Sequence, residues 1–319
     1  MAGTVLPWTA EQAAQLGVSA MKAPHSLQDH SLFRDDALID LLDRIPRSNL
    51  QVFTMGLDPA STHDWRRGST EGSSAQELWQ AVQAGRLWFN VIRVDSIDTR
   101  YAELLQEIFA GLESRVPGLR IIDGRATLLI SSPEAQVYYH ADAQPNLLWQ
   151  MRGVKRVWVY PALDPAFVSE KALGRIFTGE TDEQLPYEPS YDASSQVMEL
   201  HPGEVASWPQ NAPHRVANVE GVNISLSTEY VTAQTARRAH LRAANRVLTR
   251  FGVPARSTRE RGLVPTAKVY AYRGARRAGL VSQASAERPM EFVVAPHQPL
   301  GYQLLPETGT GSNSSSRTP

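Results

Sequence analysis

Two histidines and one aspartate constrain the fold of this chain more than any other feature. His140 and Asp142 are separated by one residue, and His214 follows at the end of the run WPQNAPH. Residues i and i+2 of a β-strand point to the same side, so one strand can direct His140 and Asp142 towards a single ion. Two histidines and one carboxylate hold non-haem Fe(II) and leave positions open for other ligands. The spacing therefore predicts a β-rich fold in which a second strand brings His214 to the other two ligands.

The neighbourhood of this motif, residues 140–161, reads HADAQPNLLWQMRGVKRVWVYP. It resembles the Jumonji-type, cupin-like 2-oxoglutarate oxygenases, in particular those that hydroxylate asparagine in hypoxia-inducible factor. In that family the H-x-D motif precedes an asparagine, an apolar strand and a G-x-K sequence, and Asn146, Gly153 and Lys155 match these places. A P-G-E turn at residues 202–204 matches the family's turn before the distal histidine. The resemblance implies bound Fe(II), 2-oxoglutarate as co-substrate, and a dioxygenase that hydroxylates its substrate.

The resemblance also implies the fold class, which is mainly β with flanking helices around a double-stranded β-helix. This core is the cupin or jelly-roll form of two facing antiparallel sheets. Capping boxes at Thr9 and Ser74 and apolar residues at helical spacing predict helices before the core. We divide the chain into an N-terminal support region (1–118), a catalytic core (119–230), a basic helical region (231–305) and a disordered polar tail (306–319).

Lys155 is the candidate anchor for the co-substrate. It falls in the same alternation as Val157 and Val159, so it should point into the barrel if those valines do. Burying an ammonium group is costly unless an anion neutralises it. The resemblance implies that this anion is the distal carboxylate of 2-oxoglutarate. The alternatives are that Lys155 faces solvent or pairs with a carboxylate of the protein.

Three more residues are candidates for the co-substrate pocket. The resemblance places Asn146 near the metal-chelating end of 2-oxoglutarate, although an asparagine at a strand end can equally satisfy backbone groups. Ser227 belongs to a polar row in the strand expected at residues 222–230, and that row faces either the barrel interior or water. Relatives often carry a threonine where Val137 stands, so Tyr138 is the candidate to supply a hydroxyl instead.

The substrate is the least constrained part of the prediction. Insertions between barrel strands commonly carry specificity, so Arg175, Tyr187 and Tyr191 in the segment 162–196 are candidate substrate contacts. A side chain of a protein or peptide is the first expectation, and a free amino acid or small natural product is the second. The alternative outside enzymes is a non-catalytic, cupin-like metal-binding sensor. The sequence does not identify the oxidised carbon or separate hydroxylation from demethylation and desaturation.

Charge is distributed unevenly along the chain. Residues 231–280 contain eleven arginines and Lys268 against one acid, Glu260, whereas the whole chain has a formal net charge of −1. Such a basic region can bind nucleic acid, but no nucleic-acid-binding module is recognisable. We therefore favour pairing of the arginines with acidic N-terminal helices or with a second subunit. The apolar side of the helix expected at 235–251 needs a cover, which predicts a homodimer joined through this region.

Composition excludes several other classes. The chain has no cysteine, which rules out disulfides, thiolate zinc sites and cysteine nucleophiles. No apolar run approaches the ~20 residues that a membrane span needs. The absence of a basic and apolar leader predicts a cytoplasmic protein.

Overall fold

The computed structural model describes residues 5–255, 257–281 and 288–306. Nearly all of the tail predicted to be disordered therefore lies outside the described residues. Within them, twelve strands form one continuous sheet in the order β1-β9-β7-β10-β5-β4-β2-β3-β11-β12, with β6 beside β10 and β8 beside β7.

The strands are β1 (Met21–Pro24), β2 (Leu50–Thr54), β3 (Arg66–Ser69), β4 (Leu87–Val91), β5 (Asp123–Ser131), β6 (Gln136–His140), β7 (Asn146–Val159), β8 (Gln196–Leu200), β9 (Glu204–Ser207), β10 (His214–Val231), β11 (Met290–Val294) and β12 (Tyr302–Leu304). The α-helices are α1 (Ala10–Gln15), α2 (Asp35–Arg44), α3 (Ala75–Ala84), α4 (Val94–Ile97), α5 (Thr99–Arg115), α6 (Glu170–Phe177), α7 (Ala233–Arg250) and α8 (Leu263–Arg277). Short 3-10 helices are η1 (Ser31–Phe33), η2 (Arg47–Asn49), η3 (Thr62–Asp64) and η4 (Pro189–Ser194).

Two long strands, β7 and β10, turn this sheet into a barrel. The first half of β10 pairs with β6 and with the second half of β7, whereas its second half pairs with β5 and with the first half of β7. Between these halves the β7–β10 register shifts, and Gly153 adopts a φ of 74° beside Asn223. Both strands bend there, so the sheet folds into two facing layers. The predicted double-stranded β-helix with flanking helices is confirmed.

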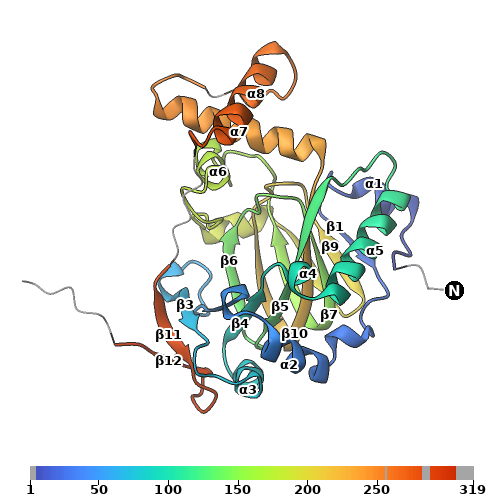
Figure 1. The fold of residues 1–319 in the computed structure, drawn as a ribbon, viewed down its shortest axis with the longest axis vertical. Helices are drawn as coiled ribbons and strands as arrows, with labels where there is room; N and C mark the ends of the chain where they lie inside the picture. Colours follow the sequence, from blue (N-terminus) through green and yellow to red (C-terminus); the bar gives the residue numbers. More distant parts are fainter. Residues whose placement is uncertain (1–4, 256, 282–287, 307–319) are drawn as a thin grey trace, which may run out of the picture.

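The main apolar core lies on the outer side of the larger layer. Helices from the N-terminal third pack there, and Leu41 of α2, Leu78 of α3 and Ile108 of α5 are fully buried against residues such as Ile130 and Ile224. The predicted capping boxes at Thr9 and Ser74 are present at the starts of α1 and α3. Helices α6, α7 and α8 gather instead at one end of the barrel (Figure 1).

The C-terminal arginines pair mainly with the segment between β7 and β8. Arg242 of α7 contacts Glu170 at 3.2 Å, and Arg246 pairs with Glu180. The expectation that these arginines would meet acidic N-terminal helices is wrong for both, because α7 packs against α6 and α8. Most of the apolar side of α7 is likewise covered by its own chain, with Leu241 only 2% exposed, whereas Phe251 at the end of α7 is 82% exposed.

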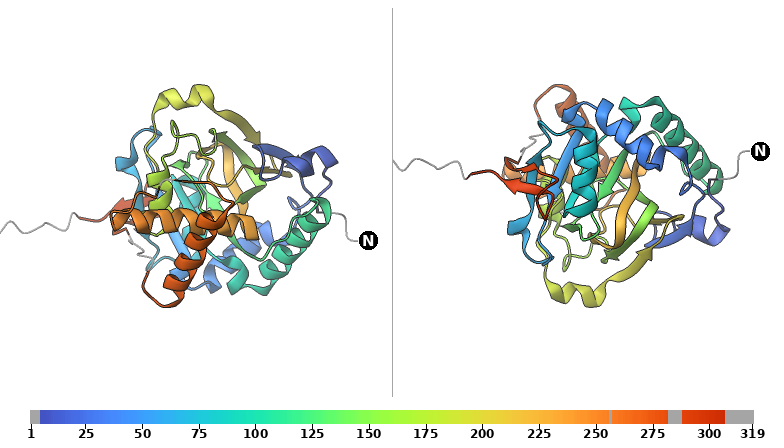
Figure 2. Two further views of the ribbon diagram at one scale, coloured as in Figure 1. Left: turned by 90° about the horizontal axis from the view of Figure 1, so that it is seen from above. Right: turned by 90° about the horizontal axis from the view of Figure 1, so that it is seen from below.

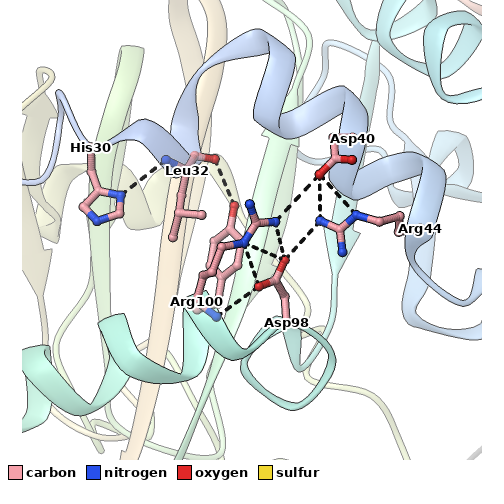
Figure 3. Close-up of polar contacts among 7 residues, drawn as sticks. His30, Leu32, Asp40, Arg44, Asp98 and Arg100 are labelled. Carbon is pink, nitrogen blue, oxygen red and sulfur yellow. Dashed lines mark hydrogen bonds and ion pairs between the residues drawn. The ribbon is translucent and has the colours of Figure 1, made fainter.

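A charged cluster fixes the start of α5 against α2 (Figure 3). Asp98 caps α5 and is 5% exposed. Its carboxylate accepts hydrogen bonds from the guanidinium groups of Arg100 at 2.6 Å and Arg44 at 3.2 Å, and Arg44 also reaches Asp40 of α2 at 2.8 Å. The bonds from Arg100, with help from Arg44, lower the pKa of Asp98 to about 2.

We expect Asp98→Asn to lower the free energy of unfolding by roughly 1–3 kcal/mol at pH 7, because charge-assisted hydrogen bonds are lost. The folded-state pKa lies below the unfolded value, so the carboxylate contributes fully at neutral pH. That contribution disappears as pH falls from about 4 through about 2. Urea unfolding at several pH values measures the difference between the two proteins. A difference that stays constant from pH 7 to pH 3 contradicts this role.

Candidate metal and co-substrate site

The three predicted metal ligands lie together at one end of the barrel. His140 ends β6 and His214 begins β10, and the two residues are paired partners in the sheet. Asp142 follows β6, and its carboxylate oxygens lie 3.6 Å from Nε2 of each histidine. The ligand atoms of all three residues are within 4.8 Å of one another. Pairing between β6 and β10 therefore assembles the triad that the spacing predicts.

Both histidines are oriented by nearby backbone. Nδ1 of His140 donates to the carbonyl oxygen of Tyr138 at 2.8 Å, and Nδ1 of His214 donates to that of Ala212 at 3.1 Å. A carbonyl oxygen only accepts hydrogen bonds, so Nδ1 of each ring carries a proton and Nε2 is the nitrogen that faces the metal position. Burial and the nearby His140 lower the pKa of His214 to about 4, which keeps this ring neutral at pH 7. Neutral imidazoles with a free Nε2 fit a divalent metal ion.

Asn146 and Ser227 support the third ligand. The amide of Asn146 donates to the carboxylate of Asp142 at 3.2 Å, and its carbonyl oxygen accepts from the hydroxyl of Ser227 at 2.9 Å. The side chain of Asn146 is thus directed at a metal ligand, not at backbone groups. Ser227 lines the central cavity, so its part of the polar row faces the barrel interior.

Lys155 is buried inside the barrel, as its alternation with Val157 and Val159 predicts. Its ammonium group donates to the hydroxyl of Ser131 at 3.2 Å and to the side-chain carbonyl of Asn218 at 2.9 Å. No carboxylate among the described residues lies within ion-pair distance of it. Burial lowers the pKa of Lys155 to about 7. A buried cation with only neutral partners fits an anionic ligand.

The triad and Lys155 line one cavity of about 700 Å³, a volume that suits a small-molecule co-substrate. Phe53, Trp65 and Trp88 give this cavity an aromatic wall. An ion pair between Arg125 and Glu229, at 2.5 Å, joins the neighbouring strands β5 and β10 at the same cavity. The cavity therefore combines the metal ligands, a cation and an apolar wall.

The comparisons with known proteins agree with this architecture. Residues 82–233 match the family described as the Cupin-like domain. The match covers a little less than half of the chain.

Among solved structures, Escherichia coli YcfD superimposes on the chain with a TM-score of 0.51 at 15% sequence identity, over 87% of this chain and 69% of YcfD. A structure of YcfD, described as a ribosomal oxygenase, in complex with cobalt and 2-oxoglutarate gives a TM-score of 0.44 at 16% identity, over 86% and 69% of the two chains. No curated protein matches the chain. The cupin-like domain fits the Jumonji-type family predicted from sequence, but these matches do not single out the hydroxylases of hypoxia-inducible factor.

Tyr138 faces the cavity beside the metal site. Its ring lies 5.3 Å from that of His140 and 4.0 Å from that of Trp65. The hydroxyl group that contacts Lys155 belongs to Ser131 instead. The co-substrate role of Tyr138 stays a prediction, and Ser131 is a pocket residue that sequence reasoning missed.

Two of the three candidate substrate contacts pack on the outside of the smaller layer. The rings of Tyr187 and Tyr191 lie 5.5 and 5.8 Å from that of Tyr139. The hydroxyl of Tyr187 donates to Asp192, which also pairs with the buried Arg215 at 2.5 Å. These contacts attach the inserted segment to the barrel, and neither tyrosine is among the residues that line the cavity.

The third candidate, Arg175, lies in α6 and is also not among the cavity-lining residues. The inserted segment contributes Asp182 and Glu183 to the cavity instead. Glu183 accepts a hydrogen bond from the backbone of Ala143 at 2.8 Å, and burial together with the charge of Asp142 raises its pKa to about 8. A lone glutamate in a polar loop gives no periodic signal, so the sequence could not distinguish it from an exposed one.

Asn211 is another residue that the sequence analysis missed. It has a φ of 65° in the turn before His214, and its amide donates to the backbone carbonyl of Asp142 at 2.8 Å. This bond ties the turn that carries one ligand to the loop that carries another. An asparagine tolerates this left-handed conformation better than most residues, which is the signal that could have identified it.

Proposed function

We propose that this protein is an Fe(II)- and 2-oxoglutarate-dependent dioxygenase that hydroxylates a side chain in a protein or peptide. The observation that carries the proposal is the presence, in one cavity, of a two-histidine, one-carboxylate triad and a buried lysine without a counterion. Either feature alone has simpler explanations. Together they match the two ends of a metal-bound dicarboxylate.

Each residue then has a definite task. His140, Asp142 and His214 hold Fe(II) through two neutral imidazoles and one carboxylate. Lys155 binds the distal carboxylate of 2-oxoglutarate, and Ser131 keeps the lysine in place. The chemistry that Fe(II) and 2-oxoglutarate supply when bound is the oxidation of a C–H bond by oxygen.

Other cavity residues orient these groups. Asn146 fixes the plane of the Asp142 carboxylate, Ser227 fixes Asn146, and the aromatic wall excludes water. Tyr138 is the further candidate for contact with the co-substrate. We assign no residue of the chain as a general base, because bound Fe(II) and 2-oxoglutarate would supply the oxidation chemistry.

A protein or peptide substrate is favoured over a free amino acid or small natural product. YcfD, which shares this fold, is described as a ribosomal oxygenase. Charged residues at the cavity, including Arg93, Arg125 and Arg288, offer several groups for recognition of a polar chain.

Mass spectrometry tests this function. The purified protein, loaded with Fe(II) and 2-oxoglutarate, should add one oxygen to a component of a lysate and release succinate. Asp142→Ala is the matched inactive control. A small metabolite as the only oxidised species favours the second substrate class. Metal binding without any succinate favours a non-catalytic sensor.

The homodimer and the cytoplasmic location stay predictions. Exposed Phe251 at the end of α7 supports a subunit contact, although the rest of the apolar side of α7 is covered by the chain itself. Light scattering at micromolar concentration measures the subunit number. Among the described residues, no helix has both the length and the apolar character to cross a membrane.

A further inference from the structure

The outward side of α8 is apolar and exposed. Leu263, Val264 and Tyr270 have exposed fractions of 90%, 66% and 65%, whereas Val269 and Tyr272 on the inward side are buried. Seen along the barrel, α7 and α8 cross one of its ends (Figure 2). Large apolar side chains grouped in this way on a surface mark an interaction site.

The same side is strongly basic. It is flanked by four exposed arginines that have no acidic partner among the described residues: Arg259 and Arg261 in the segment that leads into α8, and Arg273 and Arg277 on the helix itself. The nearby acids are already paired, Glu260 with Arg238 and Glu180 with Arg246. Together with Leu263, Val264 and Tyr270, these four arginines form what we call the α8 face.

We propose that the α8 face binds an acidic, amphipathic segment of a partner protein. Carboxylates of such a segment pair with the arginines, and its apolar side covers Leu263, Val264 and Tyr270. This is the mode by which an amphipathic helix binds to an apolar surface with charged edges.

Other occupants fit less well. The phosphate backbone of a nucleic acid pairs with the arginines but leaves Leu263 and Val264 in water. A symmetric pair of α8 helices brings arginines against arginines, because α8 contains no acid. Segments 282–287 and 307–319 of the chain each contain one glutamate and no large apolar residue, so their composition does not match that of an acidic, amphipathic occupant.

The position of the α8 face connects it with the metal site. The amide of Gln210, in the turn before His214, donates to the backbone carbonyls of Ala143 and Thr235 at 3.0 and 3.4 Å. Helix α7 is thereby attached to the loops that carry the metal ligands, and α8 packs on α7. A partner on the α8 face is held at the metal-binding end of the barrel.

Fluorescence anisotropy with the full chain tests the proposal without any need for activity. The probe is a labelled synthetic peptide of about 20 residues, with leucines at helical spacing and glutamates elsewhere. We expect saturable binding that weakens with salt. Arg273→Glu combined with Arg277→Glu should weaken it roughly tenfold or more, and Tyr270→Ser should weaken it too.

The matched control is Arg115→Glu combined with Arg120→Glu, which changes the net charge equally on a different exposed surface and should leave binding unchanged. The proposal is overturned if the control variant loses as much affinity for the peptide as the α8 variants do, or if the α8 variants lose none. So does tighter binding of a duplex DNA oligonucleotide that the α8 variants abolish. Self-association of the chain that the α8 variants abolish, measured by light scattering, also overturns it in favour of a second copy.

Discussion

Replacing Asp142 with alanine should lower the affinity of the protein for Fe(II) roughly 100-fold or more. Asp142 supplies the only negative charge in the triad, because the other two ligands are imidazole nitrogens. Without it, two neutral nitrogens remain to hold a divalent cation. Calorimetric titration with Fe(II) under anaerobic conditions measures the change.

Two further variants test whether Fe(II) binding depends on Asp142 as a metal ligand or only on the negative charge of the cavity. Asn146→Ala removes only the hydrogen bond that orients Asp142, so it should weaken Fe(II) binding less, by roughly tenfold. Asp182→Ala removes a cavity carboxylate that pairs with Arg288, at 3.2 Å, and should leave the affinity unchanged. If Asp142→Ala binds Fe(II) as the unaltered protein does, or if Asp182→Ala loses as much affinity, the assignment of the triad is wrong.

The sequence predicts those features of the site that depend on the local spacing of residues. Period-two alternation predicts that His140 and Asp142 point to the same side, and they do, although Asp142 lies just beyond the end of β6. It also predicts the inward direction of Lys155. The family resemblance added the matching turn at residues 202–204 before His214 and the role of the lysine. The strand pairing β6–β10 then determines the distances.

The parts that it missed depend on partners distant in sequence. Ser131 and Asn218 meet Lys155 only because β5, β7 and β10 are neighbours in the folded sheet. The second half of β10 is buried on both faces, with Leu226 against the helices and Ser227 against the cavity. The alternation of polar and apolar residues in β10 could not predict which of its faces is exposed to water, because neither face is exposed.

The segment 162–196, between β7 and β8, is a second case in which the partners of a residue could not be predicted from the sequence. Its tyrosines have the composition of a substrate-binding loop, yet they pack on the outer face of the smaller layer around Tyr139 and Tyr160. Sequence indicates that an aromatic loop will pack against something, but which face of a two-layer barrel it covers is a property of chain topology. The same holds for the arginines of α7, whose partners Glu170 and Glu180 lie on this segment.

The second large predicted effect is a loss of affinity for 2-oxoglutarate when Lys155 is replaced. Lys155→Ala should weaken 2-oxoglutarate binding to the metal-loaded protein roughly 100-fold, because the buried carboxylate would lose the cation that we propose as its partner. Lys155→Arg should weaken it less, since a guanidinium still pairs with a carboxylate although it is larger and planar. Calorimetry with Mn(II) in place of Fe(II) measures both affinities without turnover. If neither variant changes the affinity, the anchor lies elsewhere.

The pH dependence of binding gives an independent test of the same residue. Burial lowers the pKa of Lys155 to about 7, well below the usual value of a lysine, so above pH 7 the free protein carries a neutral amine there. Pairing with a carboxylate requires the ammonium form, so binding above pH 7 must take up a proton. The affinity for 2-oxoglutarate should therefore be constant below pH 7 and fall by up to about tenfold per pH unit above it.

Calorimetry at pH 8 in two buffers with different ionisation enthalpies measures this proton uptake directly. The unaltered protein should take up close to one proton when 2-oxoglutarate binds. Lys155→Arg should take up none, because a guanidinium is already protonated at that pH. Equal proton uptake by both proteins would assign the titration to another group and remove Lys155 as the source of the pH dependence.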